Sequence, residues 1–400
     1  MKSIKTALVD GKYKFTFVII TSLFFMWGFA HAILDVLNKH FQEVMHISKA
    51  DSAFVQVMFY LGYFTMAIPA GLWISRKGYR AGVIVGLLLY GVGSLLFIPG
   101  EDLMSFGFFL FSLYVIGCGL VFLETAANPY VTELGSRATA ASRLNFAQSF
   151  NGLGYICAPV VGSFFVFGET ASVATPYTYM GVTVLLVALV FMRMRLPEIV
   201  HDDDASGETA PVRSLVRHWP FVFGVIALFC YEISEISINS FFIDYAHDDH
   251  GISKQTASAI LSFGGLLLFM CGRFLGSFIM SRVRAEKVLA VCAVATVVTT
   301  ALVLAGLGRV SLVALIVGYF FESIMFPTIF ATSLRGLGNK TKRASSVLMM
   351  SPVGGAVGTW LMGFAADWSG SMTVSFVVPF VAFLVVMAYA LYVERLYRHS

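Results

Sequence analysis

Charged residues are scarce in this sequence of 400 residues. Asp, Glu, Lys and Arg together make up 12% of it, whereas a soluble domain carries about 25%. Hydrophobic residues make up 58%, and the mean hydropathy is +0.81. This composition excludes an ordinary soluble domain, and it also excludes a disordered chain, because both need far more polar residues. We therefore expect that lipid surrounds most of the protein.

Residues that build metal centres and enzyme active sites are few or dispersed. The cysteines lie inside apolar runs without metal-ligand spacing, at Cys118, Cys157, Cys230, Cys271 and Cys292. The histidines are scattered, and the sequence contains no HExxH, GxSxG or Walker motif. Lys and Arg lie in short segments between apolar runs and form no basic face. We predict no metal, no cofactor, no nucleic-acid partner and no enzymatic activity.

Apolar segments long enough to cross a bilayer as helices follow one another along the whole chain. They lie at residues 15–38, 51–75, 81–99, 104–130, 143–167, 175–193, 219–244, 254–280, 286–306, 310–334, 344–367 and 372–393. A membrane β-barrel would alternate apolar and polar residues, whereas the run at 81–97 is apolar on every side. The first segment has no small-residue cleavage site, so we expect it to be retained. The sequence thus predicts an all-α membrane protein with twelve transmembrane helices.

Basic residues are unevenly distributed between the two sides of the membrane that twelve crossings define. Of the 27 Lys and Arg residues, 22 lie in the terminal segments or after even-numbered crossings, and four lie in the opposite loops. Because cytoplasmic loops accumulate Lys and Arg, both termini are predicted to be cytoplasmic. One long polar stretch contains the acidic run Asp202–Asp204. It divides the chain into a six-helix half at 1–194, a linker at 195–218 and a second six-helix half at 219–400.

Two six-helix halves are the plan of transporters whose halves rock about a central site. A weak internal repeat supports this plan: GLWISRKGYRAG follows the second crossing and GSFIMSRVRAEKV follows the eighth. Each is a helix end rich in small residues, followed by a basic turn. The sequence therefore predicts two pseudo-symmetric halves with a shared site between them.

A few ionisable and amide side chains lie well inside the crossings, where a charge costs at least about 2.5–3.5 kcal/mol. They are Asp35, Glu124, Glu232, Glu235, Arg273 and Glu322, accompanied by His31, Gln148, Asn151 and Asn239. His31 precedes Asp35 by four residues, so both project from one face of a helix. Gln148 and Asn151, three residues apart, share a face in the same way. We expect these faces to line a common cavity.

Carboxylates in a cavity suit proton coupling, because burial disfavours the charged form and lets the group exchange a proton near neutral pH. Asp35 lies in the outer third of its crossing, whereas Glu124 lies in the inner part of its own. This arrangement suits a proton loaded from outside and released inside, and we predict these two as the coupling acids. The sequence leaves open whether Glu232, Glu235 and Glu322 exchange protons or only neutralise Arg273.

Three motifs carry a resemblance to a known family. LETAANPYVTELG ends the fourth crossing, SRLNFAQSFNGLG opens the fifth, and SIMFPTIFATSLRGLGNKTKRASS joins the tenth to the eleventh. The chain resembles the fucose permease family of proton-coupled sugar symporters, within the major facilitator superfamily. This resemblance implies the major facilitator fold, proton coupling at Asp35 and Glu124, and sugar contacts from Gln148, Asn151 and Arg273. Sugar hydroxyls do need amide and guanidinium partners.

Departures from the family pattern bear on the substrate. The run YEISEISINSFFIDY, with Glu235 and Asn239, looks more like the glucose/galactose branch, whereas Glu124 looks like the fucose branch. His31 and Glu322 match neither branch. We predict a monomeric symporter of the inner (plasma) membrane that takes up L-fucose or a related hexose with protons, and Glu235, Asn239 and His31 as further sugar-binding residues. A glucose/galactose transporter and a drug–proton antiporter of the same fold are the alternatives.

Overall fold

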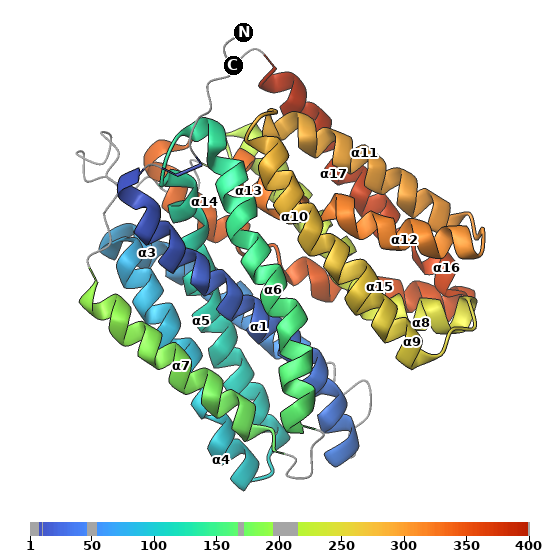
Figure 1. The fold of residues 1–400 in the computed structure, drawn as a ribbon, viewed down its shortest axis with the longest axis horizontal. Coiled ribbons are helices and arrows are strands. Elements are labelled where there is room, and N and C mark those ends of the chain that lie inside the picture. Colours follow the sequence, from blue (N-terminus) through green and yellow to red (C-terminus); the bar gives the residue numbers. More distant parts are fainter. Residues whose placement is uncertain (1–7, 10, 46–53, 167–171, 195–214, 399–400) are drawn as a thin grey trace.

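The computed structural model describes residues 8–9, 11–45, 54–166, 172–194 and 215–398. These residues fold almost entirely into helices, which form two bundles, one from α1 to α7 and one from α8 to α17 (Figure 1). Helix α1 begins and α17 ends at the upper end of the molecule in this view. We call this end the termini side.

The first bundle contains two crossings in one continuous element, α3. Its helices are α1 (Lys14–Val44), α3 (Phe54–Leu95), α4 (Phe97–Asp102), α5 (Phe106–Glu133), α6 (Ala140–Val166) and α7 (Ala174–Arg193), with 3-10 turns at Gly11–Tyr13 and Arg137–Thr139. Gly78 interrupts α3 with φ 84° and ψ 169°, a combination open essentially to glycine alone. A Cβ at Gly82 would lie 2.5 Å from Ile74 Cγ1. The chain therefore folds back at Gly78, and α3 crosses twice.

Most crossings of the second bundle consist of more than one helix. Its elements are α8 (Trp219–Asp244), the π-helix η5 (Tyr245–Asp249), α9 (Lys254–Ile260), the π-helix η6 (Leu261–Leu266), α10 (Leu267–Met280), α11 (Ala285–Leu304), α12 (Arg309–Glu322), α13 (Met325–Ser333), the 3-10 turn η7 (Gly338–Lys340), α14 (Thr341–Leu348), α15 (Val353–Ser369), α16 (Met372–Ser375) and α17 (Val377–Leu396). The tenth crossing is thus α12 followed by α13, and the eleventh is α14 followed by α15.

Two prolines leave helix carbonyl groups free for partners on other helices. Proline has no N–H, so it cannot donate to the carbonyl four residues earlier. In α5, Pro129 leaves the carbonyl of Thr125 free, and the hydroxyl of Ser345 in α14 donates to it over 3.1 Å. In the tenth crossing, Pro327 leaves the carbonyl of Ser323 free at the break between α12 and α13. The carbonyl of Thr125 therefore takes part in a contact between the bundles.

The twelve predicted crossings are confirmed. Ten helical segments among the described residues are long and apolar enough to cross a membrane, and one of them, Phe54–Asp102, contains two crossings. The remaining crossing is α6, which carries several polar side chains. The predicted range 219–244 agrees with α8, whereas α1 continues to Val44, beyond the predicted end at 38. The acidic run Asp202–Asp204 and most of the linker lie outside the described residues, so the boundaries of the two halves stay a prediction.

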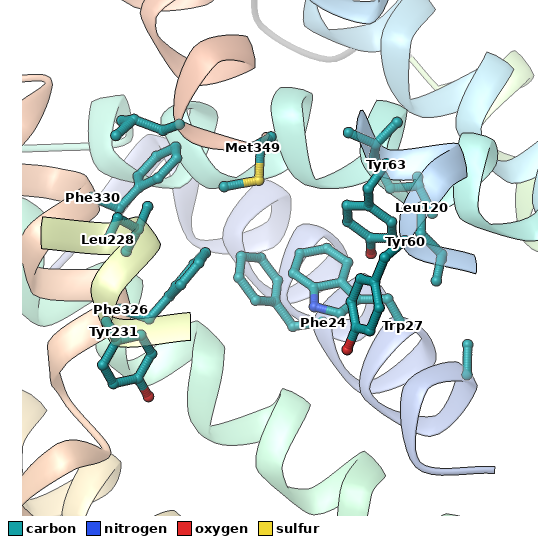
Figure 2. Packing of buried hydrophobic residues seen from close by; sticks show 14 of the residues in the cluster. Phe24, Trp27, Tyr60, Tyr63, Leu120, Leu228, Tyr231, Phe326, Phe330 and Met349 are labelled. Carbon is teal, nitrogen blue, oxygen red and sulfur yellow. The ribbon is translucent and has the colours of Figure 1, made fainter. Parts of the chain in front are cut away.

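Buried aromatic side chains of the two bundles face each other at the centre of the molecule. Figure 2 shows this packing for Phe24, Trp27, Tyr60 and Tyr63 of the first bundle and for Tyr231, Phe326 and Phe330 of the second. All of them belong to one continuous hydrophobic cluster that joins the two bundles.

Hydrogen bonds close the interface between this cluster and the termini side. The hydroxyl of Ser142 in α6 donates to the carbonyl of Ser277 in α10 over 2.6 Å, and the hydroxyl of Ser277 donates back to the carbonyl of Ser142 over 2.8 Å. Asn145 Nδ2 donates to Thr328 Oγ1 over 3.1 Å. The two bundles are therefore in direct contact on the termini side.

Arg143, counted in the sequence among the basic residues of the loops, lies in the first turn of α6 and is fully buried. Its guanidinium group donates to the carbonyls of Val131 (3.0 Å) and Ser136 (2.9 Å) and to the hydroxyl of Thr139 (2.6 Å). The last carbonyls of α5 have no partner within their own helix, and Arg143 supplies donors for them. Its position between two helix ends thus explains its burial.

Candidate functional site

A cavity of about 90 Å³ lies between the two bundles. A single water molecule needs about 10–15 Å³ of such space, so the cavity can hold several waters or a small polar solute. Its lining comes from α1, α3, α5 and α6 on one side and from α8, α10 and α13 on the other. The residues predicted from sequence that meet there are His31, Glu124, Gln148, Asn151, Glu235, Asn239 and Arg273, and Glu232 lies among them.

Glu124 and His31 are linked through a tyrosine. Glu124 is 6% exposed, and its Oε1 accepts a hydrogen bond of 2.5 Å from the hydroxyl of Tyr63. The same hydroxyl oxygen lies 3.3 Å from His31 Nε2. The other ring nitrogen of His31, Nδ1, lies 2.9 Å from the carbonyl oxygen of Trp27. Three titratable side chains from α1, α3 and α5 therefore form one chain of polar contacts.

Arg273 connects the polar face of α6 to the second bundle. Its Nη1 donates to the carbonyl of Gln148 over 3.0 Å and to Asn151 Oδ1 over 3.1 Å. Its guanidinium carbon also lies 4.4 Å from the centre of the Phe269 ring. The amide of Gln148 lies 3.4 Å from Asn128 Oδ1. Arg273 thus contacts the side-chain amide of Asn151 and the backbone of Gln148, and the side chains of all three residues are buried.

The proline break in the tenth crossing helps to position Arg273. Arg273 Nε donates over 3.0 Å to the carbonyl of Ser323, which is the carbonyl that Pro327 leaves without a helix partner. A charged donor bonded to an otherwise orphaned carbonyl is worth more than a neutral hydrogen bond. The guanidinium is therefore anchored in its own bundle while it contacts the other.

Helix α8 presents several polar side chains to the cavity from one face. Glu232, Glu235 and Asn239 are spaced at intervals of three and four residues, which places them on one side of a helix. Asn239 Oδ1 accepts a hydrogen bond of 2.8 Å from the hydroxyl of Tyr319. The amide nitrogen of Asn239 keeps its two hydrogens for another partner.

The sequence left open whether the acids in the membrane neutralise Arg273. Ion pairs in the described part of the chain include Arg284 with Glu394 and Arg335 with Glu286. In this part of the chain Arg273 thus forms hydrogen bonds with neutral groups and no ion pair. No direct salt bridge joins Arg273 to Glu235 or Glu322, although its charge acts on both carboxylates. Whether these acids exchange protons or only neutralise Arg273 thus stays open.

Two of the predicted site residues do not line the central cavity in the described part of the chain. Glu322 lies at the end of α12 and lines a second, smaller cavity inside the second bundle. Asp35 belongs to α1, one turn after His31, but its side chain is outside the described residues. Within the described ranges, no three His, Cys, Asp or Glu side chains are grouped so that they could hold a metal ion.

The sequence reading missed the aromatic residues of the cavity. Trp27, Tyr60, Tyr63 and Tyr155 line it, and the ring of Tyr155 stacks on that of His31 with a centroid distance of 6.1 Å. The spacing of Tyr60 and Tyr63 by three residues was a usable signal, because it places both rings on one helix face. Their relation to Glu124 depends on the packing of α3 against α5, which the sequence does not reveal.

Two helical bundles that enclose a polar cavity at their interface define a secondary transporter that works by alternating access. The model of the Major Facilitator Superfamily matches residues 16–351 of this chain. The chain belongs to this superfamily, and within it to the fucose permease family. The resemblance deduced from the motifs and the predicted fold are thereby confirmed.

Relatives in this family match nearly the full length of the chain. The L-fucose-proton symporter of Escherichia coli is 34% identical, over 96% of this chain and 94% of its own length. The glucose/galactose transporter of Brucella abortus is 33% identical, over 95% and 94%. Among solved structures, the transporter FucP in its outward conformation has a TM-score of 0.85 at 34% identity, covering 95% of this chain and 99% of that chain.

Proposed function

We propose that this transporter is a proton-coupled monosaccharide symporter. One observation carries the proposal: the buried carboxylate of Glu124 lies in the same cavity as the Arg273 and Asn151 pair. A proton acceptor and a set of sugar-type hydrogen-bond partners therefore share one site. Two relatives that match most of the chain, named as an L-fucose-proton symporter and a glucose/galactose transporter, support the same reading.

Recognition of a sugar is supported by the mixture of groups in the cavity. A hexose presents hydroxyls around its rim and C–H groups on its faces. Amides and a guanidinium suit the hydroxyls, and Tyr and Trp rings suit the C–H faces. We assign sugar binding to Gln148, Asn151, Arg273, Glu235 and Asn239, with Trp27 and Tyr155 as aromatic walls. L-fucose or a related hexose is the proposed substrate, and glucose or galactose is the alternative.

A drug–proton antiporter is the alternative of a different kind. Sites for apolar drugs are lined mostly by hydrophobic side chains. Here three carboxylates, three amides, a guanidinium and an imidazole line the cavity: Glu124, Glu232, Glu235, Gln148, Asn151, Asn239, Arg273 and His31. This lining favours a polyol.

We infer that the proton binds to the group formed by His31, Tyr63 and Glu124. With Nδ1 bonded to the Trp27 carbonyl, the neutral His31 ring presents a lone pair at Nε2. Tyr63 has a single hydroxyl hydrogen, which Glu124 accepts. Two buried acceptors, the carboxylate and Nε2, therefore compete for one hydrogen.

One added proton satisfies every member of this group. If it binds to Glu124, the acid donates to the Tyr63 oxygen and the Tyr63 hydroxyl donates to His31 Nε2. If it binds to His31, Nε2–H donates to the Tyr63 oxygen while Tyr63 keeps its bond to Glu124. Asp35, one turn further along α1, is proposed as the first acceptor from outside. His31 therefore acts in proton transfer in this account, in addition to the sugar binding predicted for it.

One proton supplies enough energy for accumulation. A charge crossing about 150 mV releases about 3.5 kcal/mol, which corresponds to roughly a few-hundred-fold gradient of solute. Contacts such as the Ser142–Ser277 pair close the termini side, and the basic residues of the sequence orient this side toward the cytoplasm. We therefore propose an outward-facing state of an inner-membrane monomer with both termini cytoplasmic.

Uptake into proteoliposomes tests the proposal. The purified protein is reconstituted with labelled L-fucose, D-glucose and D-galactose outside, and the lumen is made alkaline. We expect at least one of these sugars to accumulate and its addition to increase the loss of protons from the external medium. A protonophore, which collapses the gradient, should abolish the accumulation. If none of the sugars accumulates and a lipophilic cation is exchanged for protons instead, the protein is a drug–proton antiporter and the proposed sugar symport is wrong.

A further inference from the structure

A second cavity lies wholly inside the second bundle, away from the sugar cavity. Its volume is about 10 Å³, and α8, α11, α12 and α17 enclose it. Glu322 lines it and is 2% exposed, and its Oε1 is buried without a hydrogen-bond partner. Thr296, Thr299 and Thr300 of α11 face the same space.

The hydroxyl groups around this cavity already donate their hydrogens elsewhere. Thr299 and Thr300 donate to the carbonyl of Thr296 over 3.0 and 2.8 Å, and Thr296 donates to the carbonyl of Cys292 over 3.0 Å. The hydroxyl of Tyr319 donates to Asn239. These oxygens therefore offer lone pairs, and the carboxylate of Glu322 adds acceptors of its own. A cavity lined by acceptors suits an occupant that carries positive charge or only donates.

The size and the charge of the cavity restrict that occupant further. About 10 Å³ is close to the space that one water molecule needs, so a sugar is excluded. A buried carboxylate is unfavourable unless a positive charge balances it. The charged or titratable groups that interact electrostatically with Glu322 are Tyr319 on α12, Glu235 and Tyr231 on α8, and Arg273 on α10. Helices α11 and α17 contribute threonines and Phe383. Hard oxygen ligands of this kind suit a small cation.

The position of Glu322 repeats that of Glu124 in the other half. Glu124 precedes Pro129 by five residues in the fourth crossing, and Glu322 precedes Pro327 by five residues in the tenth. With two six-helix halves, these crossings correspond to one another. Each half thus carries a buried glutamate just before a proline that frees a carbonyl.

We propose that Glu322, with the hydroxyls of Thr299 and Thr300, binds one small monovalent cation, either Na⁺ or a proton held on the carboxylate beside one water. The site is connected to the sugar cavity through a single peptide, because Ser323 follows Glu322 and its carbonyl accepts the Nε hydrogen of Arg273. Only this link to sugar rests on the proposed function. Cation binding itself does not depend on which solute is carried.

Thermal unfolding of the detergent-solubilised protein without sugar tests the site. Tm is measured in NaCl and in KCl at one ionic strength and over a range of pH, for the wild type, Glu322→Gln, Thr299→Val and the control Thr183→Val. Thr183 makes the same type of bond to a helix carbonyl but is exposed and lines neither of the two cavities described above. A bound ligand raises Tm with concentration, so this readout is independent of transport.

A rise in Tm with Na⁺ in the wild type and in Thr183→Val, but not in Glu322→Gln, supports a sodium site. Thr299→Val should then need about tenfold more Na⁺ for the same effect. A proton site is supported by two results together. Tm does not respond to Na⁺, and the Tm of the wild type rises relative to that of Glu322→Gln as the pH falls. If neither Glu322→Gln nor Thr299→Val changes the dependence on Na⁺ or on pH, the proposal is wrong. If Glu322→Gln does not fold, the wild type is compared with Thr299→Val instead, and an unchanged dependence of Tm on both Na⁺ and pH makes the proposal wrong.

Discussion

Arg273 is the residue on which the sugar cavity depends most. It donates to the carbonyls of Ser323 and Gln148 and to the side chain of Asn151, and it lies over Phe269. These partners come from both bundles. A single side chain therefore contacts the proposed sugar-binding residues of α6 and joins the two bundles.

Arg273→Lys should weaken sugar binding by about 10–100-fold, because lysine keeps the charge but cannot reach the same set of acceptors, and a hydrogen bond to a charged group is worth about 1.5–3 kcal/mol. Calorimetry or Trp fluorescence with the transported sugar measures the change. Arg282→Lys is the control, since Arg282, in the turn after α10, lies over Phe278 but is exposed. If Arg273→Lys binds the sugar with wild-type affinity, Arg273 does not contribute to sugar binding.

Tyr63→Phe should move the pH dependence of sugar exchange. The lost hydroxyl supplies the one hydrogen that Glu124 accepts and that His31 also faces, so the pH profile of sugar exchange in Tyr63→Phe is expected to differ from that of the wild type. Tyr114→Phe serves as the control, because its hydroxyl contacts Thr65 over 3.0 Å, outside the cavity. The proposed proton-binding group would be contradicted by identical pH profiles for Tyr63→Phe and the wild type.

At the scale of helices, proline breaks supply polar groups to the site. Pro327→Ala would introduce an N–H that competes with Arg273 for the carbonyl of Ser323. We expect sugar affinity to fall about 2–10-fold, as for the loss of a hydrogen bond worth about 0.5–1.5 kcal/mol, while Tm does not fall. Pro379→Ala in α17 is the control, since Pro379 does not line the cavity. If Pro327→Ala raises Tm and leaves the sugar affinity unchanged, the helix break at Pro327 is not needed for sugar binding.

Helices were predicted well from the sequence, and their interruptions were not. Hydropathy places a crossing such as α8 because the bilayer selects about 20 apolar residues. The break before Pro327 escapes this criterion, since both helix pieces are apolar. Hydropathy also does not reveal which way a side chain points. Glu124 and Glu322 precede prolines by the same spacing, yet Glu124 lines the sugar cavity and Glu322 lines a separate cavity. Which face of a helix meets a cavity depends on packing between helices, and this also explains why Tyr63 was missed.

At the scale of the whole molecule, the contact between bundles on the termini side determines which way the cavity opens. A Cβ at Gly71 of α3 would overlap Ser346 of α14 in the other bundle. Gly71→Ala should therefore disfavour this closed interface, by about 1–3 kcal/mol for an overpacked contact. Spin labels at Ala138 and Val283, exposed on the termini side of the two bundles, should report a larger fraction of long distances.

Gly107→Ala is the matched control for this helix substitution, because a Cβ there meets nothing within 4 Å. It should leave the distance distribution unchanged. If Gly71→Ala gives the same distribution as the control, the α3–α14 contact does not hold the termini side closed.

Proton coupling at Glu124 is the central claim, and Glu124→Gln tests it most directly. Sugar accumulation driven by a pH gradient and sugar counterflow without a gradient are measured in the same proteoliposomes. Glutamine keeps the size of the side chain and an oxygen that can accept from Tyr63, but it does not exchange a proton. We predict that accumulation is lost while counterflow remains comparable to that of the wild type. Accumulation at the wild-type level in Glu124→Gln would contradict the account.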